Sequence, residues 1–290
     1  MSNKNFYKAF EDKYRGTREV IKERLEVYLQ FILPLKEIYP NSVALDIGCG
    51  RGEWLELLQE NGFEAQGVDS DEGMLNVCHE LKLNALQGDG IRYLQEYKDE
   101  SVTVISAFHV VEHISFEDLQ ILVQEALRVL KPGGLLILET PNPENIKVAS
   151  ESFYLDPTHL KPLPSALLSF LPEFYGFARN KIIRLQESKD LINQEYINLM
   201  QIIEGVSPDY AVVAQKNADL KILKLLDKIF DQDFGLSLHL LSEKFENRLQ
   251  SLEARINEVE AKADEALVLK HKIQNSIPWK VYKYFRDLLK

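Results

Sequence analysis

Three acidic residues stand at the ends of short apolar segments in the first third of the chain. Asp46 precedes a glycine-rich run at residues 48–52, Asp69 follows the segment 64–68, and Asp89 lies between two glycines. Carboxylates accept hydrogen bonds, so the three would suit an ammonium group, ribose hydroxyls and an adenine amino group, but they would repel phosphate. Together they indicate a cationic adenosine ligand that carries no phosphate.

The glycine-rich run has the spacing G-x-G-x-G. Gly48 and Gly50 allow a tight turn and a close approach to a ligand that a Cβ would keep away. Dinucleotide-binding proteins have G-x-G-x-x-G instead, and no Gly-Lys-Ser/Thr follows here, so a pyrophosphate ligand has little support. Each acid alone could be a helix cap or a turn former, but that alternative does not suit all three at once.

Three histidines could take part in proton transfer, because imidazole titrates near neutral pH. His109 and His113 follow the fourth apolar segment, and His159 lies in the polar, proline-containing loop 153–162. We expect His159 to be the general base, with Asp156 holding its tautomer, and His109 to be the second candidate. Alternatively, one of His109 and His113 stacks on the cofactor while the other packs or caps. The loop 153–162 could instead be a lid that takes no part in proton transfer. We expect no metal site.

The elements that must position these residues alternate between strands and helices. Short apolar runs predict strands at 42–47, 64–68, 84–87, 102–107 and 135–140, followed by two final strands at 181–186 and 210–215. Amphipathic stretches predict helices at 53–59, 72–81, 91–96 and 116–130, with a helical insert at 190–203. This alternation predicts an α/β fold with a doubly wound, Rossmann-like sheet, whose strand ends bring the three acids to one edge.

Charge and cysteine content restrict the function classes. The 290 residues carry a formal net charge of −11, which disfavours nucleic acid as a partner. Two cysteines cannot form a disulfide framework, and the chain shows neither a signal peptide nor an apolar run of 18 residues. We therefore expect a cytoplasmic protein, at most peripheral at the inner face of the plasma membrane.

Composition changes near residue 218. Only one of the 14 glycines follows Gly205, and residues 218–290 have a net charge of +1. The sequence predicts an N-terminal helical cap at 1–40, a catalytic domain at 41–217, a helical linker with a short coiled coil at 218–275, and a basic amphipathic tail at 276–290.

The coiled coil is predicted from apolar residues at spacings of three and four, broken once between Phe245 and Leu249. Its apolar positions are Leu238, Leu241, Phe245, Leu249, Leu252, Ile256, Val259, Ala263 and Ala266. We expect it to form a homo-oligomer; the alternative is a helix that packs on its own domain. In the tail, Val281, Tyr282 and Phe285 share one face of a helix, and six basic residues and one acid follow from Lys270 onward. This pattern predicts binding to an anionic membrane surface or to a membrane-associated partner, or else a helix that caps the coiled coil.

Residues 40–140 resemble the class I S-adenosylmethionine (SAM) methyltransferases, through the glycine loop, the three acids in order and the turn Lys131-Pro-Gly-Gly-Leu135. The resemblance implies that SAM is the cofactor. An aromatic and basic N-terminal cap could fold over SAM and offer Arg15 or Arg24 to its carboxylate; solvated helix charges are the alternative. The expected cofactor contacts are Arg15, Arg24, Asp46, Gly48, Gly50, Asp69, Ser70, Asp89, Gly90 and Phe108.

The first 190 residues also resemble bacterial methyltransferases that terminate O-antigen chains of lipopolysaccharide, without the kinase that some of them carry. This resemblance rests on the segments 6–24, 48–52, 108–113, 139–145 and 153–162. It implies O-methylation of a terminal sugar on a glycan or lipid-linked saccharide, beside a membrane-associated polymerase. A methyltransferase for a small metabolite or quinone, and a coiled-coil scaffold with a vestigial SAM site, remain as alternatives.

Overall fold

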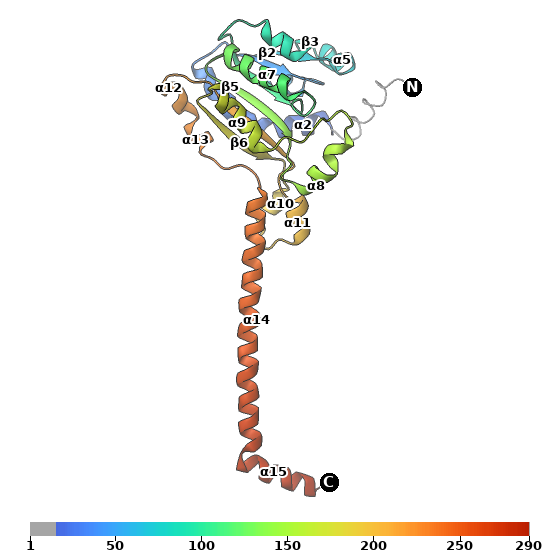
Figure 1. Ribbon diagram of the computed structural model, residues 1–290, viewed down its shortest axis with the longest axis vertical. Helices are drawn as coiled ribbons and strands as arrows, with labels where there is room; N and C mark the ends of the chain where they lie inside the picture. Colours follow the sequence, from blue (N-terminus) through green and yellow to red (C-terminus); the bar gives the residue numbers. More distant parts are fainter. Residues whose placement is uncertain (1–15, 290) are drawn as a thin grey trace, which may run out of the picture.

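A single seven-stranded sheet in the order β3-β2-β1-β4-β5-β7-β6 organises the catalytic head in the computed structural model, which describes residues 16–289 (Figure 1). The strands are β1 (Val43–Ile47), β2 (Glu64–Asp69), β3 (Ala85–Gln87), β4 (Val102–Phe108), β5 (Leu130–Pro141), β6 (Arg179–Leu185) and β7 (Asp209–Gln215). The predicted doubly wound α/β fold is confirmed. The sheet is mixed, because β7 runs antiparallel to both β5 and β6.

Helices cover both faces of this sheet. One face packs against α4 (Glu53–Glu60) and α5 (Glu72–Glu80), and the other against α6 (Gly90–Gln95), α7 (Phe116–Val129) and α9 (Ser165–Tyr175). Alternate residues of each central strand serve the two layers: Ala44 points into the first and Leu45 into the second. Both faces are apolar, so functional side chains are left to the strand ends.

The expected turn at Lys131–Leu135 is part of β5. Its pairing with β4 shifts register between Val102 and Val104, and Gly133 has a φ of +75°. Residues 131–134 therefore form an irregularity within the strand rather than a loop before it.

The N-terminal segment is part of the core. It consists of α2 (Arg18–Leu25), the short helices η1 (Glu26–Tyr28), α3 (Leu29–Ile32) and η2 (Leu33–Glu37). Tyr28, Phe31, Ile32 and Leu35 are fully buried against the first face of the sheet. This burial fixes α2 over the start of α4.

Residues 218–237, expected to be a linker, fold back on the head. They contain α12 (Leu220–Leu223), η4 (Lys224–Leu226) and α13 (Asp227–Phe230), and Leu226 and Phe230 are buried in the first core layer. The expected helical insert 190–203 is two short helices, α10 (Lys189–Ile192) and α11 (Leu199–Glu204).

A long helix, α14 (Leu238–Asn275), leaves the head and extends away from it, and α15 (Ile277–Leu288) lies across its far end (Figure 1). Only Leu241 of α14 is buried, against α11 and the loop before α14. Along its exposed part, Leu252, Ile256 and Val259 keep 41, 56 and 66 % of their surface. The coiled coil stays a prediction. Within residues 16–289, no helix has both the length and the apolar content needed to cross a bilayer.

Candidate active site

A cavity of about 1350 Å³ opens at the carboxyl ends of the strands, where the strand order reverses between β1 and β4. Open α/β sheets bind ligands at such a switch point. All of the site residues expected from the sequence line this cavity except Arg15, which lies outside the described residues: Arg24, Asp46, Gly48, Gly50, Asp69, Ser70, Asp89, Gly90, Phe108, His109, Asp156 and His159.

The glycine loop uses its own backbone donors internally. The N–H groups of Gly48 and Cys49 donate to the Val68 carbonyl at 2.8 and 3.2 Å, and the N–H of Gly50 donates to Asp69 Oδ2 at 2.8 Å. A Cβ on Gly48 would stand 2.3 Å from the Val110 side chain, and the φ of Gly48 is +71°. The loop therefore requires glycine for its shape, and it offers few amide donors to a phosphate.

The acids at the ends of β2 and β3 keep acceptor capacity for a ligand. Asp69 accepts from the Gly50 and Asp71 amides at 2.8 Å each, one on each oxygen, so each oxygen retains a further lone pair. Asp89 caps α6 by accepting from Ile91 and Arg92, both on Oδ1. The structure therefore shows the helix cap that was the alternative role for Asp89. The cap uses only Oδ1, so Oδ2 can still accept a hydrogen bond from a ligand.

Asp46 at the end of β1 is almost fully buried. The Ser106 hydroxyl on β4 donates to its Oδ1 at 2.7 Å. This bond joins the two strands on either side of the switch point and places a negative charge at the base of the cavity.

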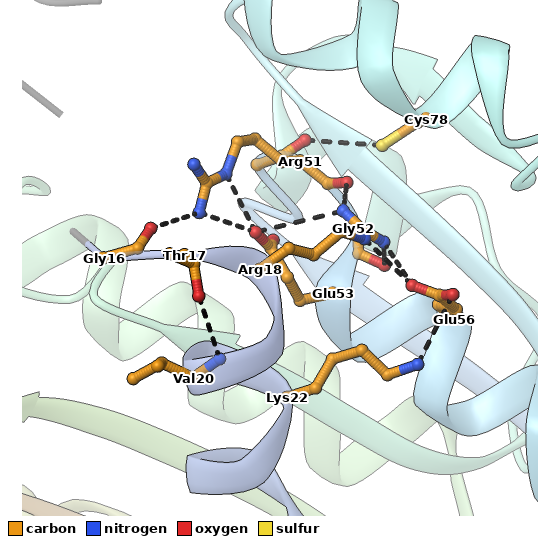
Figure 2. Close-up of polar contacts among 11 residues, drawn as sticks. Gly16, Thr17, Arg18, Val20, Lys22, Arg51, Gly52, Glu53, Glu56 and Cys78 are labelled. Carbon is orange, nitrogen blue, oxygen red and sulfur yellow. Dashed lines mark hydrogen bonds and ion pairs between the residues drawn. The ribbon is translucent and has the colours of Figure 1, made fainter. Parts of the chain in front are cut away.

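The N-terminal helix holds the glycine loop from outside (Figure 2). Arg18 of α2 donates to the Arg51 carbonyl at 2.7 Å and the Gly52 carbonyl at 3.2 Å, and pairs with Glu56 at 2.7 Å. Arg24, on the same helix, is exposed and lines the cavity. Arg18 had no predicted role, although its position in the basic N-terminal cap pointed to a contact with the glycine loop.

Aromatic rings form one wall of the cavity. Phe108 lies 5.5 Å from Trp54 and 5.1 Å from Tyr28 between ring centroids. The indole Nε1 of Trp54 is buried and has no hydrogen-bond partner within the described residues, although Trp54 lines the cavity. These rings supply an apolar surface for a planar base or for a methyl-bearing sulfonium.

His109 is held between two carboxylates. Its Nδ1 lies 3.2 Å from Glu112 Oε1 and its Nε2 3.4 Å from Glu139 Oε1. Burial acts to lower the pKa of His109, but the hydrogen bonds to Glu112 and Glu139 outweigh it and raise that pKa well above its usual value. This shift favours the protonated form of His109, which counts against its predicted role as a general base.

His113 and His159 lie together in the cavity lining, with ring centroids 4.6 Å apart, and His159 lies near the same Glu112 oxygen as His109. His159 Nδ1 donates to the Phe153 carbonyl at 2.6 Å, which leaves its Nε2 without a proton in the neutral ring. Among the described residues, the hydrogen-bond partner of the His159 ring is the Phe153 carbonyl and not the Asp156 carboxylate. Asp156 accepts from the Thr158 hydroxyl at 2.6 Å, and that hydroxyl accepts from His113 Nδ1 at 2.9 Å.

The predicted Asp156–His159 pair is therefore wrong in its partner: Asp156 orients His113 through Thr158. The physical reason is local. Asp156 accepts two bonds from Thr158, two residues on, both at Oδ1, while the His159 Nδ1 donates to the Phe153 carbonyl. Burial is the largest influence on His113 and lowers its pKa, so this imidazole is neutral at pH 7.

Comparisons with known proteins decide the family. Residues 17–180 match the family model described as a methyltransferase domain. The chain belongs to the SAM-dependent methyltransferases. A solved SAM-dependent methyltransferase from Archaeoglobus fulgidus is 34 % identical, with a TM-score of 0.64, over 73 % of this chain and all of that one.

Two curated relatives differ in how much they cover. A probable S-adenosylmethionine-dependent methyltransferase from Mycolicibacterium smegmatis is 34 % identical over 46 % of this chain and 51 % of its own length. A demethylmenaquinone methyltransferase from Bacillus cereus is 26 % identical over 64 % of this chain and 82 % of its own. The chain thus spans about half the length of the first relative.

The site of this methyltransferase fits SAM. In the bound state Asp69 would accept from the ribose hydroxyls, Asp89 from the adenine amino group, and Asp46 would face the ammonium of the methionine part. SAM supplies an electrophilic methyl group on a sulfonium. The cavity exceeds the roughly 300–1,000 Å³ of a single small-molecule pocket, so it has room for an acceptor as well.

Three acidic residues with no predicted role lie on the acceptor side of the cavity in this methyltransferase. Glu112 is 1 % exposed, Glu139 accepts from the buried Tyr28 hydroxyl, and Asp209 at the start of β7 faces the same space. Burial raises the pKa of Asp209 to about 7, although the neighbouring His109 acts in the opposite direction. Glu112 stood in the quoted segment 108–113, whereas Asp209 had no signal, because β7 follows β5 in the sheet only through tertiary pairing.

Proposed function

We propose that the protein is a SAM-dependent O-methyltransferase whose acceptor is a hydroxyl of a glycan, such as the terminal sugar of a lipopolysaccharide O-antigen. The observation that carries the proposal is the pairing of His113 and His159 at the acceptor end of the cavity, each with Nδ1 engaged and Nε2 available. A sugar hydroxyl must lose its proton as the methyl transfers, so it needs such a group; an ionised phosphate does not.

The charge of the cavity supports a neutral, polar acceptor. Glu112, Glu139 and Asp209 line or underlie its acceptor side, where His109 lies between Glu112 and Glu139. Carboxylates accept hydrogen bonds from sugar hydroxyls and repel a phosphate.

A second candidate acceptor is a quinol, as the name of the demethylmenaquinone methyltransferase relative indicates for that protein. Apolar residues at the cavity mouth favour it: Ile114, Ile121 and Leu155 line the opening. A vestigial site on a scaffold is disfavoured, because the glycine loop and all three strand-end acids line one cavity.

The extension would bring this activity to its acceptor. We infer that α14 pairs with a second copy of the chain, and that α15 binds an anionic membrane at its cytoplasmic face or a polymerase there. Helix α15 carries three basic residues, Lys280, Lys283 and Arg286, and one acid, Asp287. Its apolar side chains are exposed as well: Val281 and Phe285 expose 49 and 61 % of their surface.

The test is methyl transfer from radiolabelled SAM to two acceptor panels, O-antigen oligosaccharides and reduced quinones, followed by mass spectrometry of the product. We expect a methylated oligosaccharide and no methylated product from the reduced quinones. Transfer to a quinol alone would replace the glycan proposal with the second candidate.

A further inference from the structure

Glu112, His113 and His159 form a compact set of metal-ligating side chains. One ligand atom from each lies within 4.8 Å of the other two, and His159 Nε2 is 4.0 Å from Glu112 Oε1. They come from the loop after β4 and from the loop 153–162, and both histidines line the cavity. We propose that these three residues bind one divalent transition-metal ion at the acceptor end of the cavity, a departure from the absence of metal expected from the sequence.

The hydrogen bonds around these side chains are those of a metal site. His159 Nδ1 donates to a backbone carbonyl at 2.6 Å, and His113 Nδ1 is held by Thr158 at 2.9 Å. A ligating histidine normally gives its other nitrogen to a carbonyl or to a carboxylate-linked group, because this fixes the ring and frees one lone pair. Both rings are arranged in this way.

Glu112 is fixed in the same manner. The Thr140 hydroxyl donates to its Oε2 at 2.9 Å, and His109 contacts Oε1 at 3.2 Å, so the carboxylate cannot rotate away. The Leu160 amide also donates to the Glu112 carbonyl at 2.8 Å, which ties the His159 loop to the loop that carries Glu112 and His113. The ligands are therefore held in place by bonds other than those to the metal.

The donor set determines the class of metal. Two imidazoles and one carboxylate suit Zn²⁺, Co²⁺ or Fe²⁺, whereas Mg²⁺ and Ca²⁺ prefer oxygen ligands. Three protein ligands leave positions open toward the cavity. The neighbouring trio His109, Glu139 and Asp209 is a poorer candidate, because both His109 nitrogens already face carboxylate oxygens, which leaves the ring no nitrogen for a metal.

The role of the ion rests on the proposed function: an acceptor oxygen would occupy an open position, where the metal lowers the pKa of the hydroxyl. Metal binding itself does not depend on which acceptor is used. The two proposals can therefore fail separately.

The experiment uses the full-length protein without a polyhistidine tag, stripped with a chelator and titrated with Zn²⁺ by calorimetry and with Co²⁺ by visible absorption. We expect one ion per chain. His113→Ala, His159→Ala and Glu112→Gln should each weaken binding more than about 100-fold, and Thr158→Ala by roughly 10- to 100-fold, the usual loss when a group supporting a ligand is removed.

Two controls keep the result interpretable. His79→Ala removes an exposed histidine of α5, and Ser152→Ala removes a hydroxyl that lines the cavity outside the trio; both should bind as the unaltered chain does. SAM binding by each variant reports that it is folded. Absence of a stoichiometric ion, or binding by His159→Ala as tight as that of the unaltered chain, would overturn the metal site. Methylation of glycan by the chelated protein would then leave the proposed function standing.

Discussion

Asp69 joins the cofactor loop to the ribose position, so its removal should act on SAM affinity. Asp69→Ala is expected to weaken SAM binding by about 1.5–3 kcal/mol, the range for hydrogen bonds to a charged group. Isothermal titration calorimetry measures it, with Asp99→Ala as the control, because that side chain is 74 % exposed and pairs with Arg128. Equal SAM affinities of the two variants would remove Asp69 from the site.

His159 should affect turnover and leave SAM affinity unchanged. His159→Asn is expected to lower kcat by roughly 10²–10⁴, the scale of acid–base assistance, because the imidazole Nε2 is lost. Single-turnover methyl transfer with saturating SAM is the measurement. The general-base and metal-ligand roles both predict this loss, and the Zn²⁺ titration separates them. A kcat within twofold of the original would exclude both for this residue.

At the scale of elements, the docking of α2 on the glycine loop depends on Arg18, whose side chain is 21 % exposed. Arg18→Ala should lower the free energy of unfolding by about 1.5–3 kcal/mol, since two loop carbonyls and Glu56 lose a charged donor. Chemical denaturation measures the change.

Lys22 on the same helix provides the matched control. Among residues 16–289 it makes only ion pairs, with Glu56 and Glu60. Lys22→Ala should therefore cost at most about 1 kcal/mol, as surface pairs do. A larger loss for the Lys22 variant than for the Arg18 variant would mean that the carbonyl contacts do not stabilise the loop.

At the scale of the whole molecule, α15 is expected to bring the enzyme to anionic lipid. Neutralising Lys280, Lys283 and Arg286 together as glutamines should reduce partitioning onto phosphatidylserine vesicles roughly 100-fold, at about 1 kcal/mol per basic residue. Co-sedimentation at low and high salt measures it. Glutamine at Lys221, Lys224 and Lys228, which are exposed beside the head, is the matched control. A full-length chain that never sediments with vesicles would contradict the membrane role.

The second whole-molecule expectation concerns self-association through α14, which at 38 residues is about 57 Å long. Ile256→Asp should convert an oligomer to a 33.4 kDa monomer, because it places a charge in the apolar line of the helix. Light scattering after gel filtration reports the mass, and Gln250→Asp tests the same charge change off that line. A monomeric unaltered chain would refute the coiled coil.

The sequence by itself determined the α/β class, the strand positions and the type of cofactor. Parallel strands carry their carboxyl ends to one edge of the sheet, so Asp46, Asp69 and Asp89 had to converge wherever the helices packed. The glycine spacing also predicted the tight turn of the loop, because the positive φ and the missing Cβ that the turn needs are local properties of Gly48.

Tertiary structure decided the acceptor side. The pairing of His113 with Thr158 joins residues 45 apart, and whether Asp156 reaches His113 or His159 depends on the path of a loop that has no periodic pattern. The same holds for His109, which Glu139 on a neighbouring strand contacts at 3.4 Å, and for Phe230, which returns to the core from an expected linker. Spacing along a chain reports local periodicity, whereas these contacts follow from how distant segments fill the space around one sheet.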